Sequence, residues 1–163
     1  MEIKGKSHVY GNNINTDVII AGKYTKSLNM QDFADHCMED VDPEFRLRVK
    51  PGDVVVAGEN FGCGSSREQA PLALKYSGIS AVLAKSFARI FFRNAINIGL
   101  QVIVCDTEGI VPGDEIQIDS ASSSVLVNGT DARPFTPMPK VMQDILECGG
   151  LTAYLSENGQ FKM

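Results

Sequence analysis

Three short aliphatic runs in the middle of the chain constrain its fold more than any other feature. They are Val54–Ala57, Ile79–Ala84 and Leu100–Cys105. Runs of this length and composition are typical of strands that are buried on both faces of a parallel sheet. Helix-like segments lie between them, so the order strand–helix–strand–helix–strand predicts an α/β fold whose central parallel sheet has crossover helices.

The segments between these runs carry ordinary helix signals. The first helix follows a glycine-rich loop and continues to about Tyr76, with Gly78 as its stop, and Gly99 closes the second. Two more helices are predicted outside the central pattern, and Asn29 is a candidate N-cap for the earlier one. The helices predicted by range are Met30–Met38, Ser86–Ile98 and Lys140–Cys148.

The flanks of the central pattern predict further strands. Ile3–Tyr10 reads as a first strand, whereas Glu115–Asp119 and Ser124–Val127 alternate in polarity. Asn128-Gly129 is a hairpin-type turn that follows the second of these segments, so they form a smaller antiparallel or barrel-like part. Gly22–Asn29 is polar and without period, which predicts a loop.

Length and composition predict one soluble domain over residues 1–163. Hydrophobic residues make up 44% and charged residues 21% of the chain, the balance of an ordinary globular protein. No apolar run approaches the ~20 residues of a membrane span. The N-terminus lacks the uninterrupted apolar stretch of a signal peptide, so we expect a cytoplasmic protein without a membrane partner.

Charge and cysteine usage exclude several functions. A net charge of −5 argues against nucleic acid as a partner, but local cations can still bind a small anion. The cysteines form no C-x-x-C pair and only two histidines exist, so we expect no metal site and no cofactor in this chain. Buried free thiols are the better interpretation of Cys37, Cys63, Cys105 and Cys148.

The loop FGCGSSRE, between a buried strand and a helix, predicts an anion site. Gly62 and Gly64 allow close approach of backbone or ligand, and Arg67 supplies a planar fork that suits a carboxylate. Ser65 and Ser66 add hydroxyl groups. The pattern matches neither a P-loop nor a dinucleotide fingerprint, which leaves a small carboxylate as the favoured ligand.

A purely structural interpretation of this loop exists as well. Ser65-x-x-Glu68 matches a capping box, in which the serine would cap the helix. Pro71, however, would clash with the Arg67 carbonyl in a helix that began at Ser65. Either the first turn is irregular or the regular helix begins nearer Gln69, and a serine hydroxyl would then be free for chemistry.

A serine nucleophile of the usual kind has no support in the sequence. There is no G-x-S-x-G motif, and neither His8 nor His36 lies in a partner pattern. We therefore expect both histidines to be structural or solvated. If Ser65 acts as a base, it needs cationic surroundings that stabilise an alkoxide.

Four motifs in order carry a family resemblance that covers about residues 3–160. They are Asn15-Thr16-Asp17, FGCGSSRE, Lys85–Phe91 and Arg93–Gly99. This combination resembles the aconitase swivel domain, and most of all the free-standing small subunits of isopropylmalate isomerases and homoaconitases. The resemblance implies a swivelling β/β/α domain and a large-subunit partner that carries a [4Fe–4S] cluster.

The reaction implied by the resemblance is dehydration of a 2-hydroxy dicarboxylate and rehydration at the neighbouring carbon. In leucine biosynthesis it converts 2-isopropylmalate into 3-isopropylmalate. Homoaconitase, citraconate hydratase and dimethylmalate hydratase chemistry are alternatives within the family. A non-catalytic anion-binding or assembly module, which would use the loop only for capping and docking, is the alternative outside enzymology.

Site roles follow from the same resemblance, motif by motif. Ser65 matches the catalytic serine that removes the proton alpha to a carboxylate, and Arg67 matches the arginine that binds a substrate carboxylate. Ser66 and Gly64 match substrate-contacting positions of the same loop. Asp17 matches an aspartate that orients the neighbouring cationic and hydroxyl groups.

One departure from the family pattern bears on the substrate. Aconitase has a second substrate arginine where this chain has Asn29, and some homoaconitase-type subunits carry an arginine in this loop, which favours an alkyl substituent such as isopropyl. Arg89 and Arg93 could extend the cationic site, although pairing with acidic groups at the sheet edge or a subunit interface is preferred. The candidate specificity residues are Tyr24, Thr25, Lys26 and Leu28.

Overall fold

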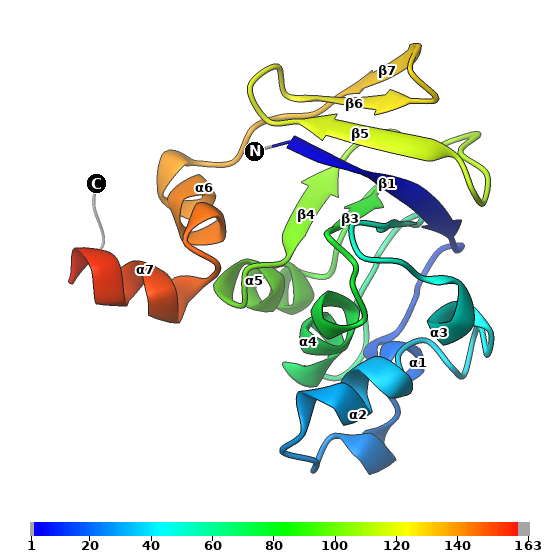
Figure 1. Cartoon of the computed structure of the whole chain (residues 1–163), viewed down its shortest axis with the longest axis vertical. Coiled ribbons are helices and arrows are strands. Elements are labelled where there is room, and N and C mark those ends of the chain that lie inside the picture. Colours follow the sequence, from blue (N-terminus) through cyan, green and yellow to red (C-terminus); the bar gives the residue numbers. More distant parts are fainter. Residues whose placement is uncertain (1, 160–163) are drawn as a thin grey trace.

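The computed structural model describes residues 2–159, which form one seven-stranded sheet with helices around it (Figure 1). The strand order is β4-β3-β2-β1-β5-β6-β7. The strands are β1 Glu2–Val9, β2 Val54–Val56, β3 Ala81–Ala84, β4 Gln101–Val104, β5 Glu115–Asp119, β6 Ser124–Val127 and β7 Asp131–Pro134. The helices are α1 Thr16–Ile19, the 3-10 helix η1 Gly22–Tyr24, α2 Met30–Asp35, α3 Phe45–Arg48, α4 Gln69–Tyr76, α5 Arg89–Asn97, α6 Lys140–Glu147 and α7 Leu151–Asn158.

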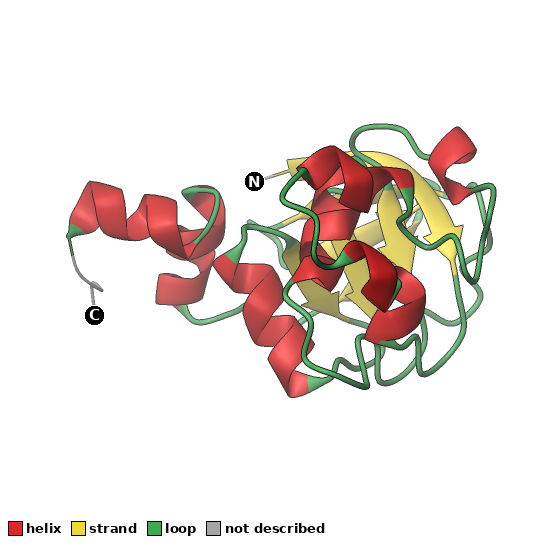
Figure 2. Ribbon diagram, turned by 90° about the horizontal axis from the view of Figure 1, so that it is seen from below, coloured by secondary structure: helices red, strands yellow, loops and turns green. Residues whose placement is uncertain are grey.

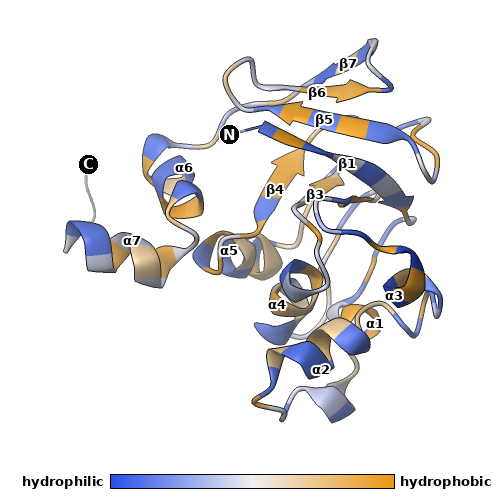
Figure 3. Ribbon diagram, in the orientation of Figure 1, coloured by the Kyte–Doolittle hydropathy of each residue, from blue (hydrophilic) through white to orange (hydrophobic). Residues whose placement is uncertain are grey.

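The predicted α/β fold with a parallel sheet and crossover helices is confirmed. Strands β1 to β4 are parallel neighbours, with Val55 opposite Val82 and Val82 opposite Val102. Because side chains alternate along a strand, these three valines point to the face that α4 and α5 cover. Figure 2 shows most helices gathered on one side of the strands, and Figure 3 shows β3 and β4 as largely hydrophobic.

The opposite face of the parallel strands packs against the antiparallel part. Val54, Val56 and Leu83 share a second core with Ile116 and Val125 from β5 and β6. The sheet therefore curls over one of its own faces, which is the predicted barrel-like feature. Two cores result, one under the helices and one inside the curl.

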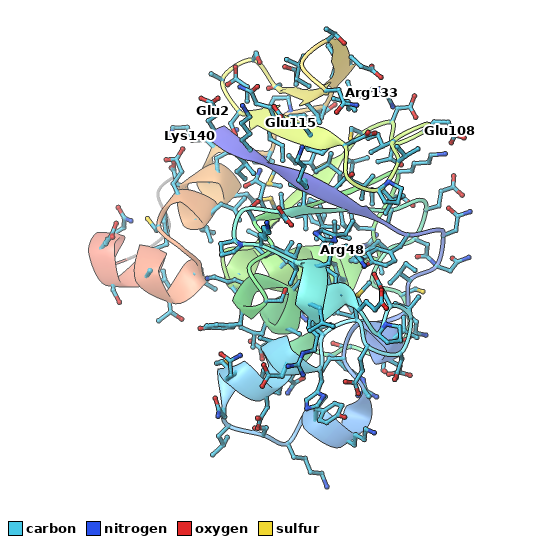
Figure 4. The ribbon with its side chains drawn as sticks, turned by 45° about the vertical axis from the view of Figure 1, so that its right-hand side comes forward. Glu2, Arg48, Glu108, Glu115, Arg133 and Lys140 are labelled. Carbon is cyan, nitrogen blue, oxygen red and sulfur yellow. The ribbon has the colours of Figure 1, made fainter. Side chains whose placement is uncertain are left out.

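Strand β1 joins the two parts of the sheet. It pairs in parallel with β2, where Ser7 lies opposite Val54, and antiparallel with β5, where Ile3 lies opposite Ile118. At the far rim, Arg133 of β7 donates to the carbonyl oxygens of Asp106 and Glu108 at 2.9 and 2.8 Å (Figure 4). These carbonyls follow β4, so the guanidinium helps to hold the curl closed.

Two predicted helices are shorter than expected, for local reasons. The segment Met30–Met38 is helical only to Asp35, and Met38 has a left-handed backbone with φ of 63°. The segment Ser86–Ile98 is helical only from Arg89, because Phe87 forms a parallel bridge with Phe61 and holds the chain extended. Asn29 caps α2 as predicted, since its side chain accepts from the Gln31 N–H.

Five elements were not predicted, namely α1, η1, α3, α7 and β7. The last predicted helix was Lys140–Cys148, but Gly150 adopts φ of 132° and the chain starts again as α7. The charged segment 41–49 contains α3, whose Phe45 is fully buried. The extended stretch around Pro134 contains β7, which pairs with β6.

His8 has a structural position, one of the two roles expected for it. Its ring is buried on β1, and its Nε2 lies 2.8 Å from Oδ2 of the buried Asp53. Burial alone would raise the pKa of Asp53, but bonds from His8 and from the Lys50 and Lys6 N–H groups outweigh it and lower that pKa. This cluster ties the start of β2 to β1.

The four cysteines are free thiols. Cys37 and Cys105 are buried as expected, and burial raises the pKa of Cys105 to about 11. Cys63 and Cys148 are only half-buried, which differs from the prediction. Between residues 2 and 159, no helix is both long and apolar enough to cross a bilayer.

Candidate active site

Two distant loops are joined by hydrogen bonds at the carboxyl end of the parallel strands. One is segment 14–17 and the other is segment 62–67, the glycine-rich loop. The Gly62 N–H donates to the Ile14 carbonyl at 2.8 Å, and the Thr16 N–H donates to the Cys63 carbonyl at 2.9 Å. The buried Thr16 hydroxyl also donates to the Ser65 carbonyl at 2.7 Å. These bonds fix the backbone from which the serine projects.

Both the backbone conformation and the close contacts at position 64 require glycine. Its φ is +91°, and a Cβ built there would lie 2.6 Å from the side-chain amide of Asn15. Asn15 is itself the N-cap of α1, because its Oδ1 accepts from the Asp17 N–H at 2.8 Å. One asparagine therefore supports the glycine turn and positions the aspartate.

The Ser65 hydroxyl faces charged side chains rather than a helix end. It donates to Asp17 Oδ1 at 3.3 Å and accepts from Arg67 Nε at 3.3 Å. Helix α4 begins at Gln69 after Glu68, which makes no side-chain capping bond. The capping-box interpretation is therefore wrong, and the alternative that the regular helix begins nearer Gln69 is confirmed.

Arg67 and Asp17 complete this arrangement. The Arg67 Nη2 lies 2.7 Å from Asp17 Oδ1, with the arginine side chain 24% exposed and the aspartate 54% exposed. The cation is thus held on one side by a carboxylate and lies beside a hydroxyl oxygen on the other. The guanidinium Nε favours negative charge on the Ser65 oxygen, whereas the Asp17 carboxylate, which accepts from the same hydroxyl, opposes it.

A pocket of about 270 Å³ lies between the glycine-rich loop and the start of α5. Its described lining includes two arginines and two serines but no carboxylate, so it suits an anion of a few carbon atoms. The loop side contributes Ser65, Ser66 and Arg67, and the α5 side contributes Arg89. The lining residues are Thr16, Gly62, Gly64, Ser65, Ser66, Arg67, Ala88, Arg89, Ile90, Phe91 and Asn94.

The segment Gly22–Asn29 lies beside this pocket. A Cβ built on Gly22 would be 2.9 Å from Arg67 Nη1, so its backbone lies against the guanidinium. The Gln69 side chain also donates to the Thr25 carbonyl at 3.4 Å. The segment was predicted as a loop, but its first residues form η1, which begins at Gly22.

The four candidate specificity residues occupy different environments. Tyr24 stacks on His36 with ring centroids 3.8 Å apart, and its hydroxyl donates to Glu39 at 2.9 Å. The bond to Glu39 raises the pKa of Tyr24, while the bond from His36 lowers the pKa of Glu39. His36 is thus structural.

The remaining three are not held in this way. The Thr25 hydroxyl donates to the Gly22 carbonyl at 2.8 Å, within its own turn. Lys26 is exposed, and Leu28 is 95% exposed. The two residues with the freest side chains are therefore a cation and an alkyl group.

The sequence analysis assigned no role at this site to two residues and left the role of a third undecided. Asn15 and Thr16 belong to the motif from which only Asp17 had been given a role, so their position beside it was the available signal. Arg89 lines the pocket, and neither it nor Arg93 is paired with an acid within 4 Å among residues 2–159. The preferred pairing at the sheet edge is therefore not observed.

No metal-binding group is found in the described part of the chain. Among residues 2–159, no three histidine, cysteine, aspartate or glutamate side chains gather so as to hold an ion. The side chains that the described residues bring to the site are a hydroxyl, a carboxylate and guanidinium groups.

Comparison with known proteins gives consistent matches. The family model for the aconitase C-terminal domain matches residues 5–108. The 3-isopropylmalate dehydratase small subunit of Caldicellulosiruptor bescii is 49% identical over 159 residues, covering 95% of this chain and 95% of that protein. The methanogen homoaconitase small subunit of Methanocaldococcus jannaschii is 48% identical over 158 residues, covering 96% and 93%.

A solved structure is similar over nearly the whole chain. It is the crystal structure of a 3-isopropylmalate dehydratase from Methanocaldococcus jannaschii, with a TM-score of 0.94 and 47% sequence identity. The match covers 98% of this chain and 96% of that one. The similarity therefore includes both the parallel sheet and its antiparallel extension.

Proposed function

The chain belongs to the aconitase C-terminal domain family, and we propose that it is the small subunit of a 3-isopropylmalate dehydratase. As such it is part of a hydro-lyase that interconverts 2-isopropylmalate and 3-isopropylmalate in leucine biosynthesis. The observation that carries this proposal is the Ser65 hydroxyl held between Asp17 and Arg67 at the mouth of an anion-sized pocket. In a member of this family, the arrangement supports the assignment of Ser65 as the base and of Arg67 as the carboxylate site that the reaction needs.

The proposed chemistry of the site starts at the serine oxygen. Ser65, as the alkoxide, takes the proton from the carbon next to a substrate carboxylate, and Arg67 offsets its charge. Loss of hydroxide from the neighbouring carbon then leaves an alkene diacid. Hydroxide then adds to the carbon that lost the proton, and Ser65 returns its proton to the carbon that lost the hydroxyl group.

Substrate binding falls to groups around the same pocket. The Arg67 fork is suited to one carboxylate, and Ser66 with the Gly64 turn borders the remaining space. Asp17 holds the guanidinium in place through the 2.7 Å contact and keeps Ser65 aimed at the pocket. These assignments are to be tested one residue at a time.

A large subunit is required for the complete enzyme, as the small-subunit names of the relatives imply. We infer that it carries a [4Fe–4S] cluster, as membership of the aconitase C-terminal domain family implies. When bound, such a cluster supplies Lewis-acid assistance to the departing hydroxyl. We also infer that the chain works as one domain in the cytoplasm, where its free thiols would stay reduced.

Homoaconitase activity is the second candidate, since a homoaconitase small subunit is 48% identical to this chain. The segment Gly22–Asn29 favours isopropylmalate, because it contains no arginine for a third carboxylate. The exposed Leu28 is better suited to an alkyl substituent, whereas Lys26 would suit a polar one. The substrate choice therefore depends on which of these two faces the pocket in the complex.

The test is reconstitution with the cognate large subunit and a substrate panel. Neither the isolated chain nor the isolated partner should turn over 2-isopropylmalate, and the mixture should. The kcat/KM of the mixture should be higher for 2-isopropylmalate than for homocitrate, citramalate or 2,3-dimethylmalate. Activity of the chain alone, or a preference for homocitrate, would contradict the proposal.

A further inference from the structure

The exposed face of α5 carries an unusual set of side chains. Arg89 and Arg93 are four residues apart and therefore lie on the same side of the helix. Ile90, which follows Arg89 in the sequence, is 51% exposed. No acid among residues 2–159 lies within 4 Å of either guanidinium, although the whole chain has a net charge of −5.

An apolar groove continues from this face. It has a volume of about 480 Å³, lies between α5 and α6, and is bordered by both arginines. Its described lining contains no acidic residue, and the nearby Asp144 is paired with Lys140 at 2.9 Å. The other lining residues are Phe92, Ile96, Asn97, Val141, Met142 and Ile145.

The groove and the pocket of the candidate active site are neighbours that share one lining residue. Arg89 borders both the groove and the pocket that contains Ser65, while Arg93 borders only the groove. A partner that completes the active site must cover the pocket. A partner segment that continues from the pocket along α5, past Arg89, would reach the groove.

We propose that the face of α5 and the α5–α6 groove bind an acidic, apolar segment of the large subunit. This inference rests on the proposed function, which requires that partner. Two unpaired guanidinium groups around an apolar trough are complementary to carboxylates that flank aliphatic or aromatic side chains. A basic segment would instead meet like charge from both arginines that border the groove.

The test is Arg93→Glu, measured in the reconstituted enzyme. The matched control is Arg46→Glu, which makes the same charge change at an exposed position on α3 that borders none of the described pockets. Binding of the large subunit is measured by titration calorimetry, and turnover is followed against large-subunit concentration. Circular dichroism checks that both variants are folded.

The expected result is a Kd for the large subunit about tenfold or more higher for Arg93→Glu, because a charge at an interface is reversed. At saturating partner, kcat should match that of the unchanged chain, and Arg46→Glu should leave both quantities as they are. Equal Kd values for Arg93→Glu and the unchanged chain would overturn the inference, as would equal weakening by both variants.

Failure of the proposed function looks different in the same experiment. In that case the unchanged chain would bind its partner without turning over 2-isopropylmalate, and the effect of Arg93→Glu on Kd would still be measured. The docking surface and the reaction are therefore judged by separate readouts.

Discussion

Arg67 contacts Asp17 and Ser65 with two different nitrogens of one guanidinium. Its Nη2 lies 2.7 Å from Asp17 Oδ1, and its Nε donates to Ser65 Oγ at 3.3 Å. Asp17 and Ser65 are 48 residues apart in the sequence, yet the three side chains contact one another, and Ser65 and Arg67 line the same pocket. A change at any of them should therefore alter activity more than stability.

Ser65→Ala should lower kcat of the reconstituted enzyme by about 10²–10⁴-fold, since it removes the proposed base. The free energy of unfolding should change by less than about 0.5 kcal/mol, because the exposed hydroxyl caps no helix. Ser156→Ala, at an exposed position on α7, is the control for the loss of a hydroxyl. An unchanged kcat would favour the non-catalytic, assembly-module interpretation.

Gly64→Ala should damage the site through the backbone. A left-handed conformation costs a non-glycine residue about 1–2 kcal/mol, and here the new methyl group would also collide with Asn15. Because a shift of ~1 Å at the serine can cost about 10²-fold in rate, we expect a large loss of kcat. Gly129→Ala is the control, since its φ of +81° imposes the same strain with no atom within 4 Å.

Leu28→Arg should change the substrate preference of the reconstituted enzyme. A guanidinium on this exposed position could bind a third carboxylate, so the ratio of kcat/KM for homocitrate to that for 2-isopropylmalate should rise about tenfold or more. Leu47→Arg makes the same change on α3, where the leucine is 79% exposed, and should not alter the ratio. An unchanged ratio in Leu28→Arg would remove this residue from the specificity loop.

Asp53→Asn should destabilise the protein in a pH-dependent way. At pH 7 the loss should be about 1–3 kcal/mol, because the buried His8 ring and two backbone donors lose a charged acceptor. The folded-state pKa of Asp53 is lowered, so its contribution is present above the ordinary pKa of ~3.9 and is lost as the pH falls through the folded value.

The measurement is urea unfolding of both proteins at pH 7, 4 and 3. The difference in unfolding free energy should shrink steadily toward the lowest pH. Asp40→Asn, at an exposed acid, should show almost no difference at any of the three values. A constant difference across the series would contradict the assignment to Asp53.

The central part of the fold could be predicted because its signals are local. Val54–Val56, Ala81–Ala84 and Gln101–Val104 are short and aliphatic, so each indicates a buried strand without reference to the others. The pairing of β1 could not be predicted in this way. Its partner β5 begins more than 100 residues later, and no local pattern encodes that register.

The site was predictable in part for the same reason. The residues of the glycine-rich loop are adjacent in the sequence, so the sequence alone predicts that they lie together. Thr16 acts through a hydrogen bond to the Ser65 carbonyl, and Arg89 enters the pocket from a separate helix. Contacts of this kind depend on how elements pack, which a single sequence does not reveal.

The position of β1 between β2 and β5 has a consequence for synthesis on the ribosome. The first strand to emerge must wait for residues 54–56 on one side and for residues 115–119 on the other. Until that second partner has been translated, one edge of β1 remains open to pairing with other chains. Nascent chains that stall before this point should therefore be the ones that aggregate or recruit chaperones.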